Sequence, residues 1–280
     1  MEQVKYIVYT SDLEESSFII KQKSNKNITS ISCSDVRSAV YLATGISAQN
    51  KKTVMVCVDS GNASRSAFSG MTEAFYRQLP VVLVTFGKKL DYTKELGDVV
   101  FSHFCVNDAE EINALLSQSK PMHIEVTTET YSIVKYQCEK LQKILCESLS
   151  NNMYLYIGQG IKAFDLSYPC KVVLGGMPDC YEGALANVLG ASLAKRRIRY
   201  IGLLSESEVI HDLNTLGNIN VNDLLFFIVV CRKKNNLLLH FAESLNFESV
   251  SVKNEDLDRQ IMQSLIENKH KTFLMHYQED

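Results

Sequence analysis

The sequence predicts an α/β protein of two domains, each with a parallel sheet covered by helices on both faces. Short apolar runs alternate along the chain with longer segments whose apolar residues recur at helical spacing, which is the pattern of βαβ units. The run Pro80 to Phe86 is apolar at nearly every position, as expected of a central strand covered on both sides. The length of 280 residues suits two domains of this kind.

The first half predicts strands separated by helices. Three helices are expected where apolar residues repeat with helical period, at Ser34–Ala48, Ser64–Arg77 and Ala109–Ser117. The strands between and around them are short and rich in β-branched residues. They are expected at Ile28–Ser32, Thr53–Val58, Pro80–Phe86, Val99–Cys105 and Met122–Val126.

The second half repeats this style. Helices are expected at Tyr131–Leu149 and Glu182–Ala194, and the tail from Asn254 contains a charged helical pattern followed by a short apolar stretch. Polar, aperiodic residues near 117–120 and 127–130 suit a domain junction, so we expect domains at 1–125 and 126–280. The strands of the second half are expected at Met153–Ile157, Cys170–Leu174, Arg199–Leu204 and Leu225–Cys231.

Composition excludes several classes of protein. The 29 Lys and Arg against 32 Asp and Glu give a formal net charge of −3, which offers no electrostatic support for a nucleic-acid partner. No stretch approaches the ~20 apolar residues of a membrane span, and the first residues lack the apolar run of a signal peptide. We therefore expect a cytoplasmic protein with no membrane partner. The eight cysteines contain no CxxC pair, and a chain of this size needs no disulfide framework.

Residues 59–87 carry the first resemblance to a known family. They resemble the pyrimidine-binding domain of thiamine-diphosphate enzymes of the pyruvate oxidase, acetolactate synthase and decarboxylase group. The resemblance places the turn Ser60, Gly61 and Asn62 at the active cleft, where it could cradle an anion at a helix N-terminus. The matching positions are Ser60 and Gly61 in the turn, Glu73, Ala74 and Tyr76 in the helix, Pro80–Val82 at the strand entry, and Ala39, Ala43 and Gly45 in the preceding helix.

The second half resembles the diphosphate-binding domain of the same enzymes. Gly176 and Met177 resemble the pair whose bulky side chain supports the bent cofactor, and Asn187–Ala194 resembles the family's alanine-rich helix. The order and length of the two domains are similar to those of the compact sulfopyruvate and phosphonopyruvate decarboxylases. The resemblance implies thiamine diphosphate and Mg²⁺ as cofactors. It also implies a homodimer or tetramer, with Ala184–Ala194 near an interface.

The family's catalytic position is altered. The resemblance places a glutamate there, which hydrogen-bonds the aminopyrimidine ring of the cofactor, but counting back from Ala39 this chain has Val36. Valine carries no donor or acceptor and cannot share a proton with the ring. Glyoxylate carboligase is similar in carrying valine at this position, so the change alone does not exclude activity. Asp35 is adjacent but is expected to point elsewhere.

The metal and diphosphate positions are altered as well. Where the family has Gly-Asp-Gly at the end of a strand, this chain has Ser205, Glu206 and Ser207. The carboxylate of Glu206 is a doubtful metal ligand, since it is one methylene longer than aspartate. The two serine side chains narrow the space that close phosphate approach requires. Mg²⁺ demands near-octahedral oxygen geometry, so a displaced carboxylate matters.

The third altered position follows the next strand. The family's second metal ligand there is an asparagine, and this chain has Arg232 and Lys233, whose charges repel a divalent cation. Glu206 and Lys233 could form an ion pair, Arg232 and Lys233 could hold a small anionic ligand directly, or both could be solvated loop residues. The pair Asn235 and Asn236 is the alternative source of shifted ligands.

Histidines offer no separate site by sequence. His103 and His123 lie on expected strands and are predicted to be hydrogen-bonded residues of the core or sheet edge. His211 and Asp212 are neighbours on a helix and are predicted to face different ways. No GxSxG, P-loop or HExxH motif occurs, so hydrolase, NTPase and zinc-protease readings have no support.

Two functions remain open from the sequence. The favoured one is a diverged member with a lost or altered cofactor site, a pseudoenzyme or non-canonical member acting as a dimer. The alternative is a thiamine-diphosphate-dependent decarboxylase or carboligase of 2-oxo acids that works without the glutamate. The alterations at Val36, at Ser205–Ser207 and at Arg232 and Lys233 all remove parts of the same chemistry, and for this reason the first is favoured.

Overall fold

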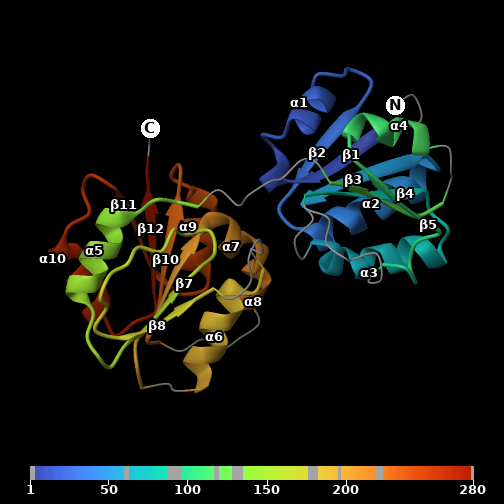
Figure 1. Ribbon diagram of the computed structural model, residues 1–280. Coiled ribbons are helices and arrows are strands. Elements are labelled where there is room, and N and C mark those ends of the chain that lie inside the picture. The colour runs from blue at the N-terminus through green and yellow to red at the C-terminus, as the bar shows by residue number, and fades with distance from the viewer. Residues whose placement is uncertain are drawn as a thin grey trace. The chain divides into compact units, whose positions relative to one another are not determined.

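The chain forms two compact units, Met1–Ser132 and Ile133–Asp280. The computed structural model describes residues 4–59, 63–87, 96–116, 120–127, 135–175, 182–194, 197–217 and 223–278. Each unit is an α/β layer structure, shown in blue to green and in yellow to red in Figure 1. The α/β class with two parallel sheets, predicted from the sequence, is confirmed.

The first unit contains a six-stranded parallel sheet in the order β2-β1-β3-β4-β6-β5. Helices α2 (Val36–Asn50) and α3 (Ala63–Tyr76) pack on one face, while α1 (Ser17–Lys23), η3 (Ala109–Glu111) and α4 (Ile112–Leu115) pack on the other. A 3-10 turn, η1 (Ser11–Leu13), follows the first strand. The strands are β1 (Val4–Thr10), β2 (Thr29–Cys33), β3 (Thr53–Asp59), β4 (Val81–Phe86), β5 (Ser102–Val106) and β6 (Met122–Val126).

The second unit repeats the strand order of the first. Its strands lie in the order β11-β12-β10-β9-β7-β8. If the strands of each unit are numbered from one, this order, read from its opposite edge, is the same as that of the first sheet. The strand pairs between these six strands are all parallel. The strands are β7 (Tyr154–Ile157), β8 (Lys171–Leu174), β9 (Tyr200–Ser205), β10 (Leu225–Cys231), β11 (Glu248–Lys253) and β12 (Thr272–Tyr277).

Helices cover both faces of the second sheet (Figure 1). Alternate residues of β10 pack into hydrophobic cores on the two faces of the sheet. Phe226, Ile228 and Val230 lie in one core, and Phe227 and Val229 lie in the other. Such a continuous apolar run is what a strand covered on both faces requires. The first side is covered by α5 (Glu139–Ser148) and α10 (Arg259–Glu267), and the second by α6 (Ala184–Ala194), α7 (Glu206–His211), α8 (Leu213–Gly217) and α9 (Asn236–Ser244).

The predicted strands are present with shifts of one to three residues at their ends, and β6 and β10 have the expected bounds. Three strands were not predicted: β1, β11 and β12. The expected helix at Tyr131–Leu149 is wrong at residues 135–138, because α5 begins only at Glu139. Ahead of it, Tyr136 forms an isolated parallel bridge with Ile161.

The predicted cysteine state holds within the described part of the chain, where all seven cysteines are free. Cys57 and Cys231 are buried in β3 and β10, as their apolar surroundings indicated. The described helices include none that is both long and apolar enough to cross a membrane.

His103 and His123 form a buried polar contact between β5 and β6. Their Nδ1 atoms lie 2.9 Å apart, and His123 Nε2 lies 2.9 Å from Thr85 Oγ1 on β4. His123 is almost fully buried, and burial followed by the nearby charge of His103 lowers its pKa to about 3. The prediction of hydrogen-bonded strand histidines is confirmed.

Acidification is expected to destabilise both units. Burial lowers the pKa of His276 on β12 to about 4, so this histidine, like His123, is neutral in the folded chain. An unfolded histidine titrates near pH ~6.5, so the stabilisation is complete above that pH and is lost as pH falls toward the folded values. The expected loss is about 2 kcal/mol per histidine at pH 5. Urea unfolding at pH 7.5 and pH 5 measures it.

The control for this prediction is His240, whose side chain is exposed on α9. His240→Gln is expected to leave the pH dependence unchanged, whereas His123→Asn and His276→Asn should each flatten it. An unchanged slope in both buried variants would contradict the prediction.

Candidate functional site

The second sheet has a topological switch point between β7 and β9. The chain leaves β7 for β8 on one side and returns to β9 on the other, so the connections after these two strands diverge. In open parallel sheets, ligands bind in the crevice outside the carboxyl ends of strands at such a point. The residues there are Gly158, Gln159 and Gly160 after β7, and Ser205 and Glu206 at the end of β9.

Ser205 serves as the N-cap of α7 rather than as a free hydroxyl. Its Oγ accepts from the backbone N of Glu208 at 3.4 Å, and its own N and Oγ both donate to Glu208 Oε2 at 2.8 Å. This reciprocal arrangement is a capping box, which satisfies donors at a helix start. The sequence Ser-Glu-Ser-Glu therefore has a local structural role in addition to its place at the sheet edge.

Glu208 is fully buried at this edge. Its carboxylate lies against Gly158 and Gly160: a Cβ on Gly158 would fall 2.3 Å from both carboxylate oxygens, and one on Gly160 would fall 3.1 Å from Oε2. Burial raises the pKa of Glu208, while bonds from Ser205 and the facing backbone amides of Gly160 and Gln159 lower it. The two glycines therefore leave space that the Glu208 carboxylate fills.

Glu206 is hydrogen-bonded to Asn235. Asn235 Nδ2 donates to Glu206 Oε1 at 2.6 Å, while the Asn235 Oδ1 accepts from Leu238 N at 3.1 Å as the N-cap of α9. The Asn235 amide oxygen is therefore bonded to the start of α9, and the amide NH₂ group points toward the Glu206 carboxylate. Ser207, the next residue, is half-buried on α7.

Arg232 and Lys233 follow β10 and are both exposed. The described residues include no ion pair between Glu206 and Lys233; Asn235 takes that place beside Glu206. Arg232 lies near Tyr136, whose phenol pKa is raised to about 12 by burial and then by the charge of Glu206. Tyr136 thus stays protonated at neutral pH beside the switch point.

The Asp212 carboxylate accepts hydrogen bonds from a second set of backbone N–H groups. Its Oδ1 accepts from Gly183 N at 3.0 Å, and its Oδ2 accepts from Leu185 N at 3.1 Å and Ala186 N at 3.4 Å, at the start of α6. A carboxylate at a helix N-terminus is stabilised by these amides and by the helix dipole. The sequence identified no role for Asp212, because its partners lie 26 to 29 residues away.

Asp212→Ala is expected to lower the free energy of unfolding of the second unit by about 1–2 kcal/mol, since it removes the cap of α6. Chemical denaturation followed by circular dichroism measures the change. Asp256→Ala, which removes a carboxylate from a turn after β11, is the control and should change stability little. An equal effect of both substitutions would contradict the assigned cap.

In the first unit, Val36 begins α2 and is buried in the core beneath it. Asp35 is its N-cap: Ser38 N donates to Asp35 Oδ1 at 2.8 Å, so this carboxylate points to the helix start as expected. The remaining predicted cofactor-binding positions, Ser60, Gly61, Asn62, Gly176 and Met177, lie outside the described residues.

Glu206 and Asn235, as they are arranged, do not fit an Mg²⁺ ion. Mg²⁺ needs several oxygens in octahedral geometry, but the Asn235 amide presents nitrogen to Glu206. Among the residues that the structure describes, no group of three or more His, Cys, Asp or Glu side chains is placed to hold a metal ion. The amides of Gln159 and Gly160 face the internal carboxylate of Glu208.

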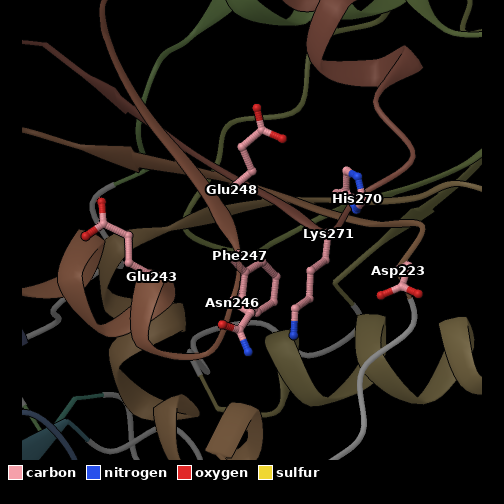
Figure 2. Close-up of a pocket in the computed structure, with 7 residues that line it drawn as sticks. All are labelled: Asp223, Glu243, Asn246, Phe247, Glu248, His270 and Lys271. Carbon is pink, nitrogen blue, oxygen red and sulfur yellow. The ribbon is translucent and has the colours of Figure 1, made fainter.

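A hollow at the amino ends of the strands of the second sheet is a weaker candidate for a functional site. It lies before β11 and β12 and is lined by Asp223, Glu243, Asn246, Phe247, Glu248, His270 and Lys271. Figure 2 shows Glu248 and Lys271 extending in opposite directions, with Lys271 alongside Phe247. Because the charged groups do not converge and the strands' amino ends face it, this hollow has no arrangement suited to chemistry.

A model of a known protein family matches most of the first unit. Residues 1–112 match the family model described as "Thiamine pyrophosphate enzyme, N-terminal TPP binding domain". These residues are therefore similar to the N-terminal domain of thiamine pyrophosphate enzymes. The match covers most of the first unit, including α2 with Val36.

Two curated relatives are each named 2-succinyl-5-enolpyruvyl-6-hydroxy-3-cyclohexene-1-carboxylate synthase. The one from Flavobacterium psychrophilum is 32% identical over 80 residues, which is 29% of this chain and 14% of the relative. The one from Flavobacterium johnsoniae is 34% identical over 61 residues, or 22% of this chain and 11% of the relative. The matched segment thus spans about a seventh or less of these relatives.

A similar solved structure is the thiamine diphosphate-dependent 4-hydroxybenzoylformate decarboxylase of Rhodococcus jostii RHA1. It is 9% identical, the TM-score is 0.37, and the alignment covers 98% of this chain and 96% of that chain.

Sequence reasoning missed several residues that the structure brings to the switch point. These are Gly158, Gly160 and Glu208, and also Tyr136, which was assigned to a helix. One local signal was available, because Ser205 followed three residues later by Glu208 is the capping-box pattern. The contact of Glu208 with the loop after β7 had no such signal.

Proposed function

We propose that this chain is a diverged thiamine-pyrophosphate-fold protein whose second domain does not bind a metal diphosphate, and that it acts as a non-catalytic, self-associating protein. The observation that carries the proposal is the bond from Asn235 Nδ2 to Glu206 Oε1. It places a donor where a second metal oxygen is needed, while the oxygen of the same amide caps α9. Val36 adds that the chain offers no carboxylate at the family's catalytic position.

Calorimetric titration with thiamine diphosphate and Mg²⁺ tests this proposal. The expected result is no heat of binding up to millimolar cofactor, and no change when Mg²⁺ is replaced by EDTA. Micromolar, metal-dependent binding that is lost in Glu206→Ala would overturn it. Asn235→Asp is the informative variant, because it puts a second carboxylate beside Glu206 and restores an all-oxygen pair.

The second candidate is a thiamine-diphosphate-dependent decarboxylase or carboligase acting on 2-oxo acids. It is favoured by the family match of the first unit and by the position of Glu206, which directly follows β9. This function requires Asn235 to release α9 and turn its oxygen toward a metal. Glu206→Gln would then abolish both cofactor binding and turnover, whereas the first proposal expects neither in the wild type.

Self-association is proposed through the outer face of α6. Asn187, Gly190 and Ala194 are exposed there, and an added Cβ on Gly190 would meet nothing within 4 Å. Small exposed residues on one helix face allow a second helix to approach closely.

Gly190→Arg is therefore expected to leave the folded unit intact and to convert a dimer into a monomer in sedimentation velocity. Lys269→Glu, at an exposed position outside the α6 face, is the control and should leave the sedimentation coefficient unchanged. A dimer that persists in Gly190→Arg would contradict the use of this face.

A further inference from the structure

The carboxyl edge of the second sheet contains a small cradle of hydrogen-bond donors and glycines. It is formed by Gly158, Gln159 and Gly160 after β7 and by Ser205 at the end of β9. Two of the donors are the backbone N and the Oγ of Ser205, each 2.8 Å from the atom they bind. The amides of Gln159 and Gly160 face the same group.

The glycines of the cradle have no room for side chains. A Cβ on Gly160 would fall 2.2 Å from Ser205 Oγ, and the three atoms nearest to a Cβ on Gly158 all belong to the Glu208 carboxylate. Glycines that let backbone approach an acceptor closely, together with converging amides, are the construction of a nest for an oxyanion. In this chain the acceptor is a side chain of the protein itself.

A capping box alone does not explain this arrangement. Such a box needs only the bond from the N-cap backbone to the glutamate, which Ser205 N supplies. Glu208 instead extends beyond its own helix into the loop after β7, 48 to 50 residues away in sequence, and is fully buried there. Among the described residues, its Oε1 has no hydrogen-bond partner.

We propose that Glu208 is an internal ligand of this oxyanion cradle, and that removing its carboxylate opens the cradle to a phosphate group. The inference rests on the proposed function, because it names what occupies the second domain's anion position in place of a diphosphate. The ligand class is a phosphate monoanion or dianion, or the terminal phosphate of a diphosphate. No metal takes part, because the donors are amides and a hydroxyl.

The test uses the full chain with inorganic phosphate and inorganic pyrophosphate as probes. In Glu208→Ala, pyrophosphate is expected to raise the melting temperature by about 5 °C at saturation, with a dissociation constant of the order of 1 mM or tighter. The wild-type protein should show no rise. Glu208→Gln is the matched control: it has the length of glutamate, fills the cradle, and should also show no rise.

A second variant distinguishes cradle binding from a change of overall charge. Gly158→Ala combined with Glu208→Ala puts a methyl group where the carboxylate was, so it should fold and lose the response to pyrophosphate. A response that persists in this double variant would overturn the inference. So would no response in Glu208→Ala, or an equal response in the wild type.

Folding of the variants is followed by circular dichroism. If Glu208→Ala does not fold, Glu208→Ser is used, and recovery of its fold by added pyrophosphate supports the inference while failure to recover overturns it. These outcomes are independent of thiamine diphosphate binding by the wild type. Binding there would overturn the proposed function, whereas a silent Glu208→Ala would overturn only the internal ligand.

Discussion

Gly158→Ala is expected to lower the free energy of unfolding of the second unit by about 3 kcal/mol. The added Cβ would fall 2.3 Å from both oxygens of Glu208, closer than atoms can approach. A flexible, exposed glutamate would turn away at little cost, but Glu208 is fully buried and accepts two bonds from Ser205. Moving it leaves a buried carboxylate and buried donors without partners. Urea unfolding measures the loss.

The same substitution is expected to be far less costly when the carboxylate is absent. In a Glu208→Ala background, Gly158→Ala should therefore lower the free energy of unfolding by much less than it does in the wild type. The difference is the coupling energy of a double-mutant cycle, which we expect to be about 2 kcal/mol. Gly190→Ala is the control glycine, since an added Cβ there meets nothing within 4 Å and alanine favours the helix. Additive effects of the Gly158 and Glu208 substitutions would contradict the contact.

Arg199→Met is expected to lower the free energy of unfolding of the second unit by about 3–5 kcal/mol. Arg199 is 5% exposed and lies over the Phe226 ring. Its Nη1 donates to His270 O at 3.0 Å, and its Nη2 donates to Leu265 O at 2.9 Å and to Thr272 Oγ1 at 3.0 Å. Methionine fills part of the volume but leaves these acceptors unsatisfied in the core.

Lysine at position 199 cannot make all the hydrogen bonds of the Arg199 guanidinium. Burial lowers the pKa of Arg199 to about 10, which still leaves it charged at neutral pH. Arg199→Lys has one nitrogen for three acceptors and is expected to recover less than half of the loss. Arg259→Met, at an exposed position on α10, is the control and should cost less than about 0.5 kcal/mol. Equal losses at the two arginines would contradict the buried role.

The fold was predictable where a segment's pattern is local. Pro80–Phe86 and Leu225–Cys231 are apolar at nearly every position, and both are central strands with the expected bounds to within one residue. By contrast, Val4–Thr10 was not assigned, although its β-branched and aromatic residues were a usable signal. This strand lies between β2 and β3, a position set by pairing and not by its own sequence.

The candidate site was predictable only in part. Spacing from Gly190 placed Glu206 at the end of a strand, and it does follow β9 directly. Of the alternatives left open for it, the ion pair with Lys233 is not formed among the described residues. Asn235 donates to Glu206 instead, because its Oδ1 caps α9 and its Nδ2 faces the carboxylate. Residue spacing alone does not predict that the Asn235 amide both caps α9 and donates to Glu206.

The sequence by itself determined the α/β class and the two repeated sheets, since periodicity depends on neighbouring residues. By resemblance it also predicted which positions differ from the family's cofactor motifs. Only the tertiary structure decided which donor each carboxylate of the segment 206–212 meets. Glu206 meets Asn235, Glu208 meets the loop after β7, and Asp212 meets α6. These partners lie 26 to 50 residues away and are brought together by the strand order, so the contacts of these carboxylates are a property of the assembled sheet.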